Sequence, residues 1–236
     1  MTATTSSPTE DSVRERAVIC LSGGMDSTVC ATLASRDFDV YALHFSYGQR
    51  TEARELASAR AVAEYIGAKE FLPLRMDLFR QIGGSALTDT SIAVPNAPED
   101  EATIGHEVPV TYVPFRNAHF LSAAVSWAEV LGAPTVSIGA VEQDSSGYPD
   151  CRPAYYDAFN ALIQQGTKEG NIRVITPLIH LKKAEIVRLG VELHAPLHVS
   201  WSCYSGEEKA CGVCESCSLR LRAFKEAGEK DPIPYV

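Results

Sequence analysis

The chain has 236 residues, of which 45% are hydrophobic and 22% charged, and its formal net charge is −9. This composition is typical of a folded globular domain and excludes disordered, collagen-like and coiled-coil chains. No apolar run approaches the ~18–20 residues that a membrane-spanning helix needs, and the N-terminus has no apolar segment typical of a signal or transit peptide. The acidic balance argues against binding to the phosphates of nucleic acid. We therefore expect a cytoplasmic protein with neither nucleic-acid nor membrane partners.

Short apolar runs alternate with helical patterns along most of the chain. Residues 1–16 are rich in Thr, Ser, Glu and Pro, which predicts a disordered N-terminal tail. The predicted strands are 17–21, 40–45, 70–74, 136–139 and 172–175, and the predicted helices are 26–36, 51–66, 117–131, 155–165 and 182–193. Strands that alternate with helices form right-handed crossovers, so this order predicts a doubly wound α/β domain with a parallel sheet. Residues 77–115 show no sustained period, which is typical of a lid, a binding loop or disorder.

A glycine-rich loop follows the first predicted strand and opens a helix, with the sequence Ser22-Gly23-Gly24-Met25-Asp26-Ser27. The glycines let backbone N–H groups converge on an anion, and the helix N-terminus adds further donors. The two serine hydroxyls are suited to phosphate oxygens, whereas Asp26 is suited to a bridging Mg²⁺. The segment lacks the Gly-Lys-Ser/Thr of a Walker A loop, and it resembles the PP-loop of ATP pyrophosphatases. The alternative is an ordinary turn with a helix cap.

The PP-loop resemblance implies that ATP with magnesium is a co-substrate. We expect the nucleotide to contact the loop and its flanks, namely Leu21, Ser22, Gly23, Gly24, Met25, Asp26, Ser27 and Thr28. The segment after the second predicted strand is a further candidate for the adenine or ribose, through Tyr47, Gln49 and Arg50.

Four of the seven cysteines lie close together near the C-terminus, at Cys203, Cys211, Cys214 and Cys217. Four thiolates with two C-x2-C steps suit one closed, tetrahedral, structural Zn²⁺ per chain. An iron–sulfur cluster is the first alternative, although the downstream ligand and proline of ferredoxins are missing. Disulfides are the second alternative. We expect a nucleotide-binding domain over 17–200 and a zinc-binding segment over 201–236 packed on it.

Several motifs together resemble the 7-cyano-7-deazaguanine synthase family: the PP-loop, SGYPDCRP at 146–153, TPLI at 176–179, the cysteine pattern and DPIPY at 231–235. The resemblance spans about 17–235. It implies a parallel sheet of the adenine-nucleotide α-hydrolase type with a small zinc-bearing helical appendage. It also implies that a carbon–nitrogen ligase converts 7-carboxy-7-deazaguanine, ammonia and ATP to the nitrile, a queuosine precursor, and releases AMP and pyrophosphate.

The resemblance assigns roles to further residues. Catalytic candidates are Asp26, Ser27, Arg116 and Lys182, and substrate-binding candidates are Gly147, Tyr148, Asp150 and Arg152. Asp150 is suited to accept two hydrogen bonds from the guanine-like edge. Arg116 is suited to a phosphate or to the substrate carboxylate, with an ordinary surface arginine as the alternative. Lys182 and Lys183 open a predicted helix, where cations are unfavourable unless an anion holds them.

Three other functions stay open at this point. A relative could stop at the amide, or a related PP-loop enzyme could modify a tRNA base, although the short acidic chain argues against the latter. A non-catalytic module that senses a nucleotide and carries zinc is the third. The chain has no spare length for a glutaminase domain, so free ammonia is the expected nitrogen donor. A homodimer is compatible with the sequence.

Overall fold

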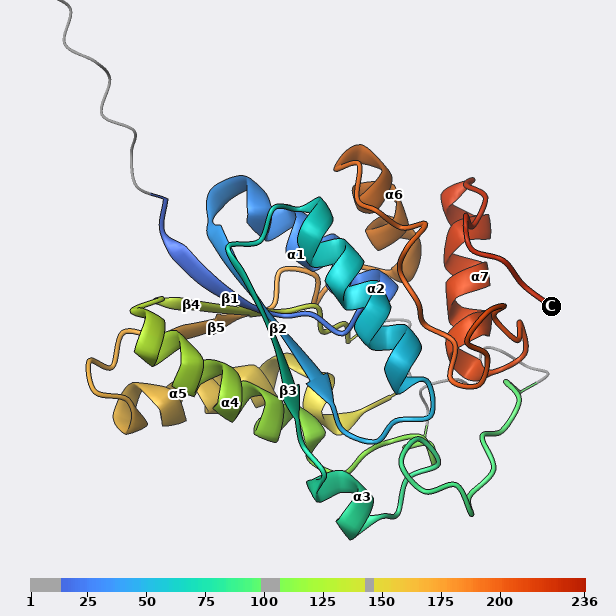
Figure 1. Cartoon of the computed structure of the whole chain (residues 1–236), viewed down its shortest axis with the longest axis horizontal. Coiled ribbons are helices and arrows are strands. Elements are labelled where there is room, and N and C mark those ends of the chain that lie inside the picture. The colour runs from blue at the N-terminus through green and yellow to red at the C-terminus, as the bar shows by residue number, and fades with distance from the viewer. Residues whose placement is uncertain (1–13, 99–106, 143–146) are drawn as a thin grey trace, which may run out of the picture.

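The computed structural model describes residues 14–98, 107–142 and 147–236 (Figure 1). Its centre is a five-stranded parallel sheet in the order β3-β2-β1-β4-β5. The strands are β1 (Arg16–Cys20), β2 (Asp39–Ser46), β3 (Glu70–Arg75), β4 (Thr135–Ile138) and β5 (Arg173–Ile175). The chain winds outward from β1 in one direction and then returns to β4 on its other side. Ligands of such doubly wound sheets bind beyond the carboxyl ends of the strands at this switch point.

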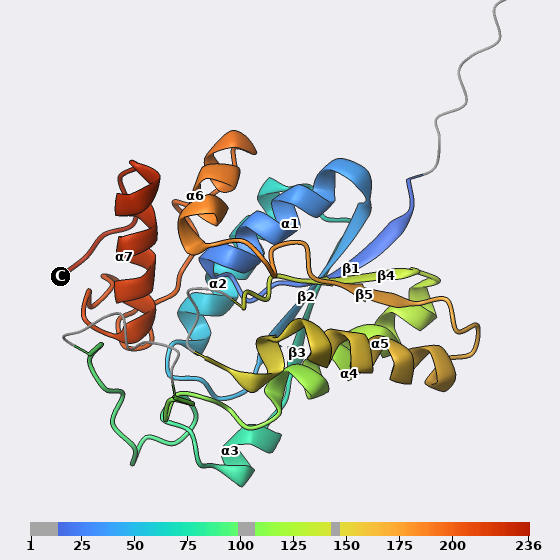
Figure 2. The same cartoon turned by 180° about the vertical axis from the view of Figure 1, so that it is seen from behind.

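The helices form two layers (Figures 1 and 2). On one face lie α1 (Met25–Asp37), α2 (Glu52–Tyr65), α6 (Lys183–Glu192) and α7 (Glu215–Ala227). On the other face lie α4 (Arg116–Leu131) and α5 (Pro153–Gly166), with the short α3 (Leu78–Ile82) at the end of β3 and the 3-10 turn η2 (Pro149–Cys151) before α5. The described part of the chain holds no helix that is both long and apolar enough to cross a membrane.

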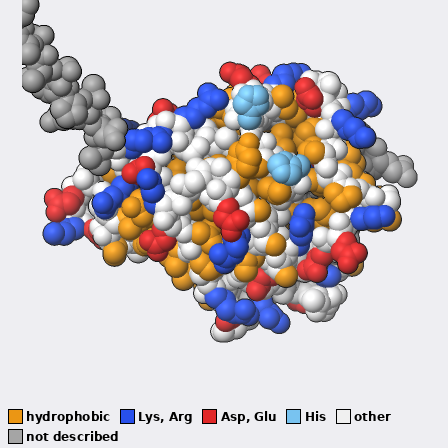
Figure 3. Space-filling model, turned by 45° about the horizontal axis from the view of Figure 1, so that its top comes forward, with side chains coloured by type: hydrophobic (Ala, Val, Ile, Leu, Met, Phe, Trp, Pro, Cys, Tyr) orange, Lys and Arg blue, Asp and Glu red, His pale blue; other side chains and the backbone are white. Residues whose placement is uncertain are grey.

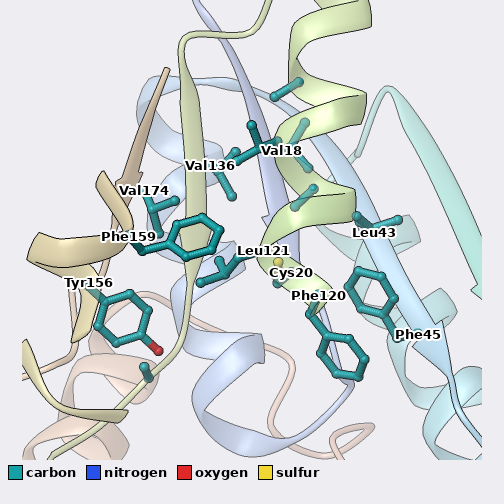
Figure 4. Packing of buried hydrophobic residues seen from close by; sticks show 14 of the residues in the cluster. Val18, Cys20, Leu43, Phe45, Phe120, Leu121, Val136, Tyr156, Phe159 and Val174 are labelled. Atoms are coloured by element: carbon teal, nitrogen blue, oxygen red, sulfur yellow. The ribbon is translucent and has the colours of Figure 1, made fainter. Parts of the chain in front are cut away.

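Alternating side chains of the central strands explain this layering. In β1, Ala17 and Ile19 belong to the apolar cluster beneath α1 and α2, whereas Val18 and Cys20 belong to the cluster that α4 and α5 cover. Figure 4 shows the second cluster, in which side chains from the strands meet Leu121 and others from the helices. A strand buried on both faces must be apolar at successive positions, which is the pattern of the sequence here.

The predicted strands and helices are confirmed to within one or two residues at most ends. The doubly wound parallel fold is confirmed as well. Most of the predicted tail, 1–13, lies outside the described residues, and Arg16 already begins β1. Within the aperiodic segment 77–115 the structure contains α3 and a series of turns. Its acidic run at 99–101 lies outside the described residues.

The C-terminal segment returns to the start of α1. Trp201 N–H donates to the carbonyl of Gly23 at 2.7 Å, and α7 packs against α6. Arg220 of α7 is buried and forms a two-pronged ion pair with Asp231, at 2.7 and 2.9 Å. The last residues are thereby fixed beside the cysteines, where Ala210 pairs with Tyr235 in an isolated bridge.

Candidate active site and metal centre

The loop after β1 is organised by its own hydroxyl groups. The Ser22 and Ser27 hydroxyl oxygens lie 2.9 Å apart. Gly24 N–H donates to Ser22 Oγ at 3.2 Å, and Ser27 Oγ donates to the Gly24 carbonyl at 3.0 Å. The loop therefore has a fixed shape at the N-terminus of α1.

Two glycines allow this loop to sit tightly among its neighbours. Gly23 has φ +86°, and a Cβ there would lie 2.7 Å from the Glu55 carbonyl oxygen of α2. At the end of β4, a Cβ on Gly139 would lie 2.9 Å from the Asp26 carbonyl. Only glycine fits both positions. The close approach of β4 to α1 brings the switch point of the sheet next to the loop.

A cavity of about 280 Å³ opens above the loop, and a second of about 200 Å³ adjoins it. Ser22, Gly24 and Ser27 line the first cavity, and Met25 and Asp26 line both. Leu21, Gly23 and Thr28 do not line either cavity among the described residues. They are buried instead, and Thr28 Oγ1 donates to the Gly24 carbonyl at 2.9 Å. These three residues therefore support the loop from behind.

The lysine at the second cavity is Lys183 rather than Lys182. Lys183 Nζ contacts Asp26 Oδ2 at 2.5 Å, and the two side chains are 13% and 24% exposed. Lys182 is the N-cap residue of α6 and lines neither cavity among the described residues. The helix begins one residue later than predicted, so the adjacent side chain is the one that faces the loop. Asp26 Oδ1 is buried and has no hydrogen-bond partner.

Arg116 lines both cavities at the start of α4. Its Nη1 donates to the Tyr47 hydroxyl at 2.9 Å, and its guanidinium lies over the rings of Tyr47 and Phe120. Phe45 and Phe120 stack with ring centroids 4.0 Å apart, as Figure 4 shows. This end of the cavity combines flat apolar surfaces with one cation, which suits an aromatic heterocycle or an anion.

The residues after β2 hold the wall of the first cavity. Gln49 is buried, and its Oε1 accepts the Tyr47 N–H at 2.8 Å. The Arg50 guanidinium donates to three carbonyls of the segment after α3, those of Ala86, Asp89 and Ile92. Gln49 and Arg50 line the cavity as predicted, but the described donors of Arg50 are directed at the protein.

The predicted substrate residues are divided by the structure. Tyr148 lines both cavities, while Arg152 is exposed as the N-cap residue of α5. Gly147 and Asp150 do not line either cavity among the described residues. Asp150 is 4% exposed and packs behind Asn117, which donates its backbone N–H to Asp150 Oδ2 at 3.1 Å.

Asp150 nevertheless keeps a free acceptor. Its Oδ1 is buried without a hydrogen-bond partner, and burial raises the pKa of this carboxyl above its usual value. Burial likewise raises the pKa of the neighbouring Cys151 thiol to about 12. A thiol with that pKa is protonated at neutral pH, so Cys151 is an inert wall residue.

Sequence reasoning missed several residues that line the cavity. They are Glu55 of α2, Asn117 of α4, and Trp201, Ser202, Tyr204 and Ser216 of the C-terminal segment. Glu55 Oε1 accepts the Thr51 hydroxyl at 2.8 Å and Oε2 accepts the Gln49 amide at 3.1 Å. Burial raises the pKa of the Glu55 carboxyl despite these donors. A polar residue inside an amphipathic helix pattern was the only local signal for it.

The four cysteines converge as predicted. The sulfur atoms of Cys203, Cys211, Cys214 and Cys217 all lie within 4.8 Å of one another. Four ligands at ~2.3 Å around a tetrahedral metal lie about 3.8 Å apart, close to the 3.9 Å between the Cys211 and Cys217 sulfurs. Cys203 Sγ also accepts N–H groups from Ser205, Gly206 and Cys211. Such donors stabilise thiolates, so the residues fit a closed metal site.

The loop, the sheet order and the cavity at the switch point define a nucleotide-binding α/β protein of the PP-loop type. The family model for "Queuosine biosynthesis protein QueC" matches residues 16–228. The chain therefore belongs to the QueC family of queuosine biosynthesis proteins.

Two relatives cover almost the whole chain. A 7-cyano-7-deazaguanine synthase of Acidobacterium capsulatum is 75% identical over 223 residues, which cover 94% of this chain and 97% of that protein. A protein of the same name from Koribacter versatilis is 63% identical over 224 residues, covering 94% and 93%.

Solved structures are more distant. An NMN synthetase of Francisella tularensis is 17% identical, with a TM-score of 0.44 over 80% of this chain and 65% of that one. An NH3-dependent NAD synthetase of Campylobacter jejuni is 19% identical, with a TM-score of 0.45 over 80% and 69%.

Proposed function

We propose that this chain is an enzyme, a nitrile-forming carbon–nitrogen ligase that makes 7-cyano-7-deazaguanine from 7-carboxy-7-deazaguanine, ammonia and ATP. The observation that carries this proposal is the 75% identity to a 7-cyano-7-deazaguanine synthase over 94% of the chain. The cavity at the end of the sheet provides a place for the reaction, because phosphate-binding and aromatic-binding surfaces meet there.

The chemistry explains why a phosphate loop and a heterocycle pocket adjoin. The substrate carboxylate oxygen attacks the α-phosphorus of ATP, and pyrophosphate leaves. Ammonia then attacks the acyl carbon, AMP departs with that oxygen, and the primary amide forms after loss of a proton. The amide oxygen attacks the α-phosphorus of a second ATP, and elimination of AMP and protons leaves the nitrile. Each cycle therefore uses two ATP molecules at one site.

The loop residues would hold the phosphates. Gly24 N–H and the hydroxyls of Ser22 and Ser27 are donors at the cavity wall. Asp26 would hold magnesium, because its Oδ1 is a buried acceptor without a partner and carboxylate oxygens are the ligands that Mg²⁺ prefers. Bound magnesium would neutralise charge on the phosphates. Lys183 holds the other oxygen of Asp26 and adds a second positive charge beside the loop.

The heterocycle would lie toward Tyr148 and Arg116, where aromatic rings and the guanidinium line the cavity. Asp150 Oδ1 is a buried acceptor one layer behind the wall. The guanine-like edge offers two N–H donors, so we assign Asp150 to that edge. This assignment requires the Asn117 side chain, whose Nδ2 donates to the Asp150 carbonyl at 3.1 Å, to move aside.

The four cysteines would hold one structural zinc. Zinc at a closed four-thiolate site stabilises the fold around it and leaves no open position for a substrate. Cys214→Ala should therefore release the metal and lower the thermal midpoint of unfolding. Cytoplasmic location and the homodimer stay predictions.

The proposal is tested by incubating the chain with 7-carboxy-7-deazaguanine, ATP, Mg²⁺ and ¹⁵N-ammonium and identifying the products by mass spectrometry. The expected result is a nitrile that contains one ¹⁵N atom, with two AMP and two pyrophosphate molecules for each nitrile. A labelled amide as the final product would identify an amide-forming enzyme. Binding of ATP without hydrolysis would favour the nucleotide-sensing module, and release of ADP and phosphate would contradict the PP-loop chemistry.

A further inference from the structure

The C-terminal segment reaches into the phosphate loop, and one of its hydroxyl groups lies at the cavity wall. Met25 N–H, at the start of α1, donates to Ser202 Oγ at 3.4 Å. The preceding residue, Trp201, donates its N–H to the Gly23 carbonyl. A Cβ on Gly24 would lie 3.9 Å from Ser202 Oγ. Ser202 therefore lies directly against the loop, although 177 residues separate it from Met25.

The acceptor capacity of this hydroxyl is used by the protein. Ser202 Oγ accepts from Met25 N–H and, at 3.5 Å, from Arg220 Nη1. A hydroxyl has two acceptor positions and one donor hydrogen. Both acceptor positions face N–H donors, and among the described residues no acceptor faces the hydrogen. Ser202 lines both cavities, so its hydrogen is available to a ligand there.

The neighbours of Ser202 hold it in place. Cys203 follows it and belongs to the four-cysteine cluster. Arg220 is fixed by Asp231 and also donates to Ser200 Oγ at 2.9 Å. Because Ser202 is held by the cysteine cluster on one side and by Arg220 on the other, little conformational freedom is lost when it binds a ligand.

We propose that Ser202 is a phosphate-binding residue, which donates its hydroxyl hydrogen to the phosphates of ATP at the PP-loop. The four-cysteine segment is thereby a wall of the nucleotide site in addition to a structural element. This inference rests on the proposed use of ATP, but it can be tested without the deazaguanine substrate. A hydrogen bond to an anionic oxygen is stronger than one between neutral groups.

The test measures binding of inorganic pyrophosphate, ATP and adenosine to the full chain with its metal and Mg²⁺, by calorimetry. Ser202→Ala should weaken binding of pyrophosphate and ATP about ten- to a hundredfold and leave adenosine binding unchanged. Ser205→Ala is the matched control, because Ser205 is exposed in the same segment. Metal content and the thermal midpoint should equal those of the unmutated chain. Pyrophosphate binding by Ser202→Ala equal to that of the unmutated chain would overturn the proposal.

A second pair of variants separates the hydroxyl from packing. Ser202→Thr and Ser202→Val have almost the same shape and differ in one hydroxyl. The Thr variant should bind pyrophosphate more tightly than the Val variant by about the same factor of ten or more, and equal affinities would overturn the proposal.

Product formation distinguishes the two proposals. A chain that binds pyrophosphate through Ser202 but makes no nitrile would contradict the proposed function alone. A nitrile-forming chain whose Ser202→Ala variant binds normally would contradict the Ser202 proposal alone. An unmutated chain that binds neither ATP nor pyrophosphate would contradict both.

Discussion

Two buried ion pairs stand close together in this protein and differ in how completely they are bonded. Arg220 and Asp231 are 2% and 5% exposed, and both ends have further partners: Asp231 also accepts from Tyr235 and Ile233, and Arg220 also donates to Ser200. Asp26 and Lys183 share a single contact and leave Asp26 Oδ1 buried and unpartnered. A buried polar atom without a partner is costly, and such atoms mark ligand sites when a cavity adjoins them. The saturated pair therefore stabilises the fold, and the open pair is available for a ligand.

The largest effect should come from breaking the saturated pair. Asp231→Asn leaves the buried Arg220 charge uncompensated, so we expect the free energy of unfolding to fall by about 3–5 kcal/mol. Urea denaturation measures this change. Asp77→Asn is the control, because the Arg75–Asp77 pair is more than half exposed and should contribute no more than ~1 kcal/mol. A loss in Asp231→Asn as small as that of the control would remove the distinction between the two pairs.

The open pair should behave in the opposite way. Asp26→Ala should reduce pyrophosphate release by at least about 100-fold, because it removes a fixed charge that faces the phosphates. Its thermal midpoint should stay near that of the unmutated chain, since one exposed-edge contact is lost. Release of pyrophosphate can be followed with a coupled assay, alongside thermal unfolding. A variant that unfolds but retains its turnover per folded molecule would show that Asp26 is a structural residue.

The two neighbouring lysines sharpen the comparison. Lys183→Met should reduce turnover about tenfold or more, because a cation beside the phosphates is lost, whereas Lys182→Met should change it less than about twofold. Both variants keep a long apolar stem, so they differ mainly in which charge is removed. Steady-state kinetics with varied ATP measures the effect. The reverse ranking would restore the role that the sequence assigns to Lys182.

The smallest effect concerns Glu55, a carboxyl at the cavity wall with Arg116 and Glu52 among the nearby charges. Burial raises its pKa in the folded state. The folded protein therefore holds this proton more tightly than the unfolded chain, and the associated stability is lost as the pH rises through the raised pKa. Glu55→Gln should remove this loss and gain on the order of 1 kcal/mol relative to the unmutated chain at neutral pH.

Denaturation at several pH values checks this prediction, with Glu64→Gln, exposed on the same helix, as the control for charge alone. If the two glutamine variants have the same pH dependence of stability, the Glu55 carboxyl carries no burial penalty.

The sequence predicts the sheet, the loop and the cysteine cluster because each depends on local patterns. Apolar runs define β1 and β2, and the C-x2-C steps bring sulfurs together through short chain segments. Residue choices that depend on one position in a helix are harder. The true start of α6 exchanges Lys182 for Lys183, and the pattern alone contains nothing that decides between them.

Contacts between distant segments are beyond local patterns altogether. Ser202 reaches Met25 across 177 residues, and the donors of Arg50 are used by carbonyls around Ala86. Asp150 is buried behind Asn117 through hydrogen bonds between two segments that the sequence places 33 residues apart. The charge distribution also requires the structure: acidic and basic side chains are interspersed on the face that Figure 3 shows.

The central claim is that one PP-loop site activates first an acid and then its amide. The most direct measurement supplies the synthetic primary amide with ATP and Mg²⁺ and without ammonia, and quantifies nitrile and AMP. The account predicts that the amide becomes the nitrile, with one AMP formed for each nitrile, and that Asp26→Ala abolishes the conversion. A chain that consumes the acid with ammonia but leaves the amide unchanged would contradict it.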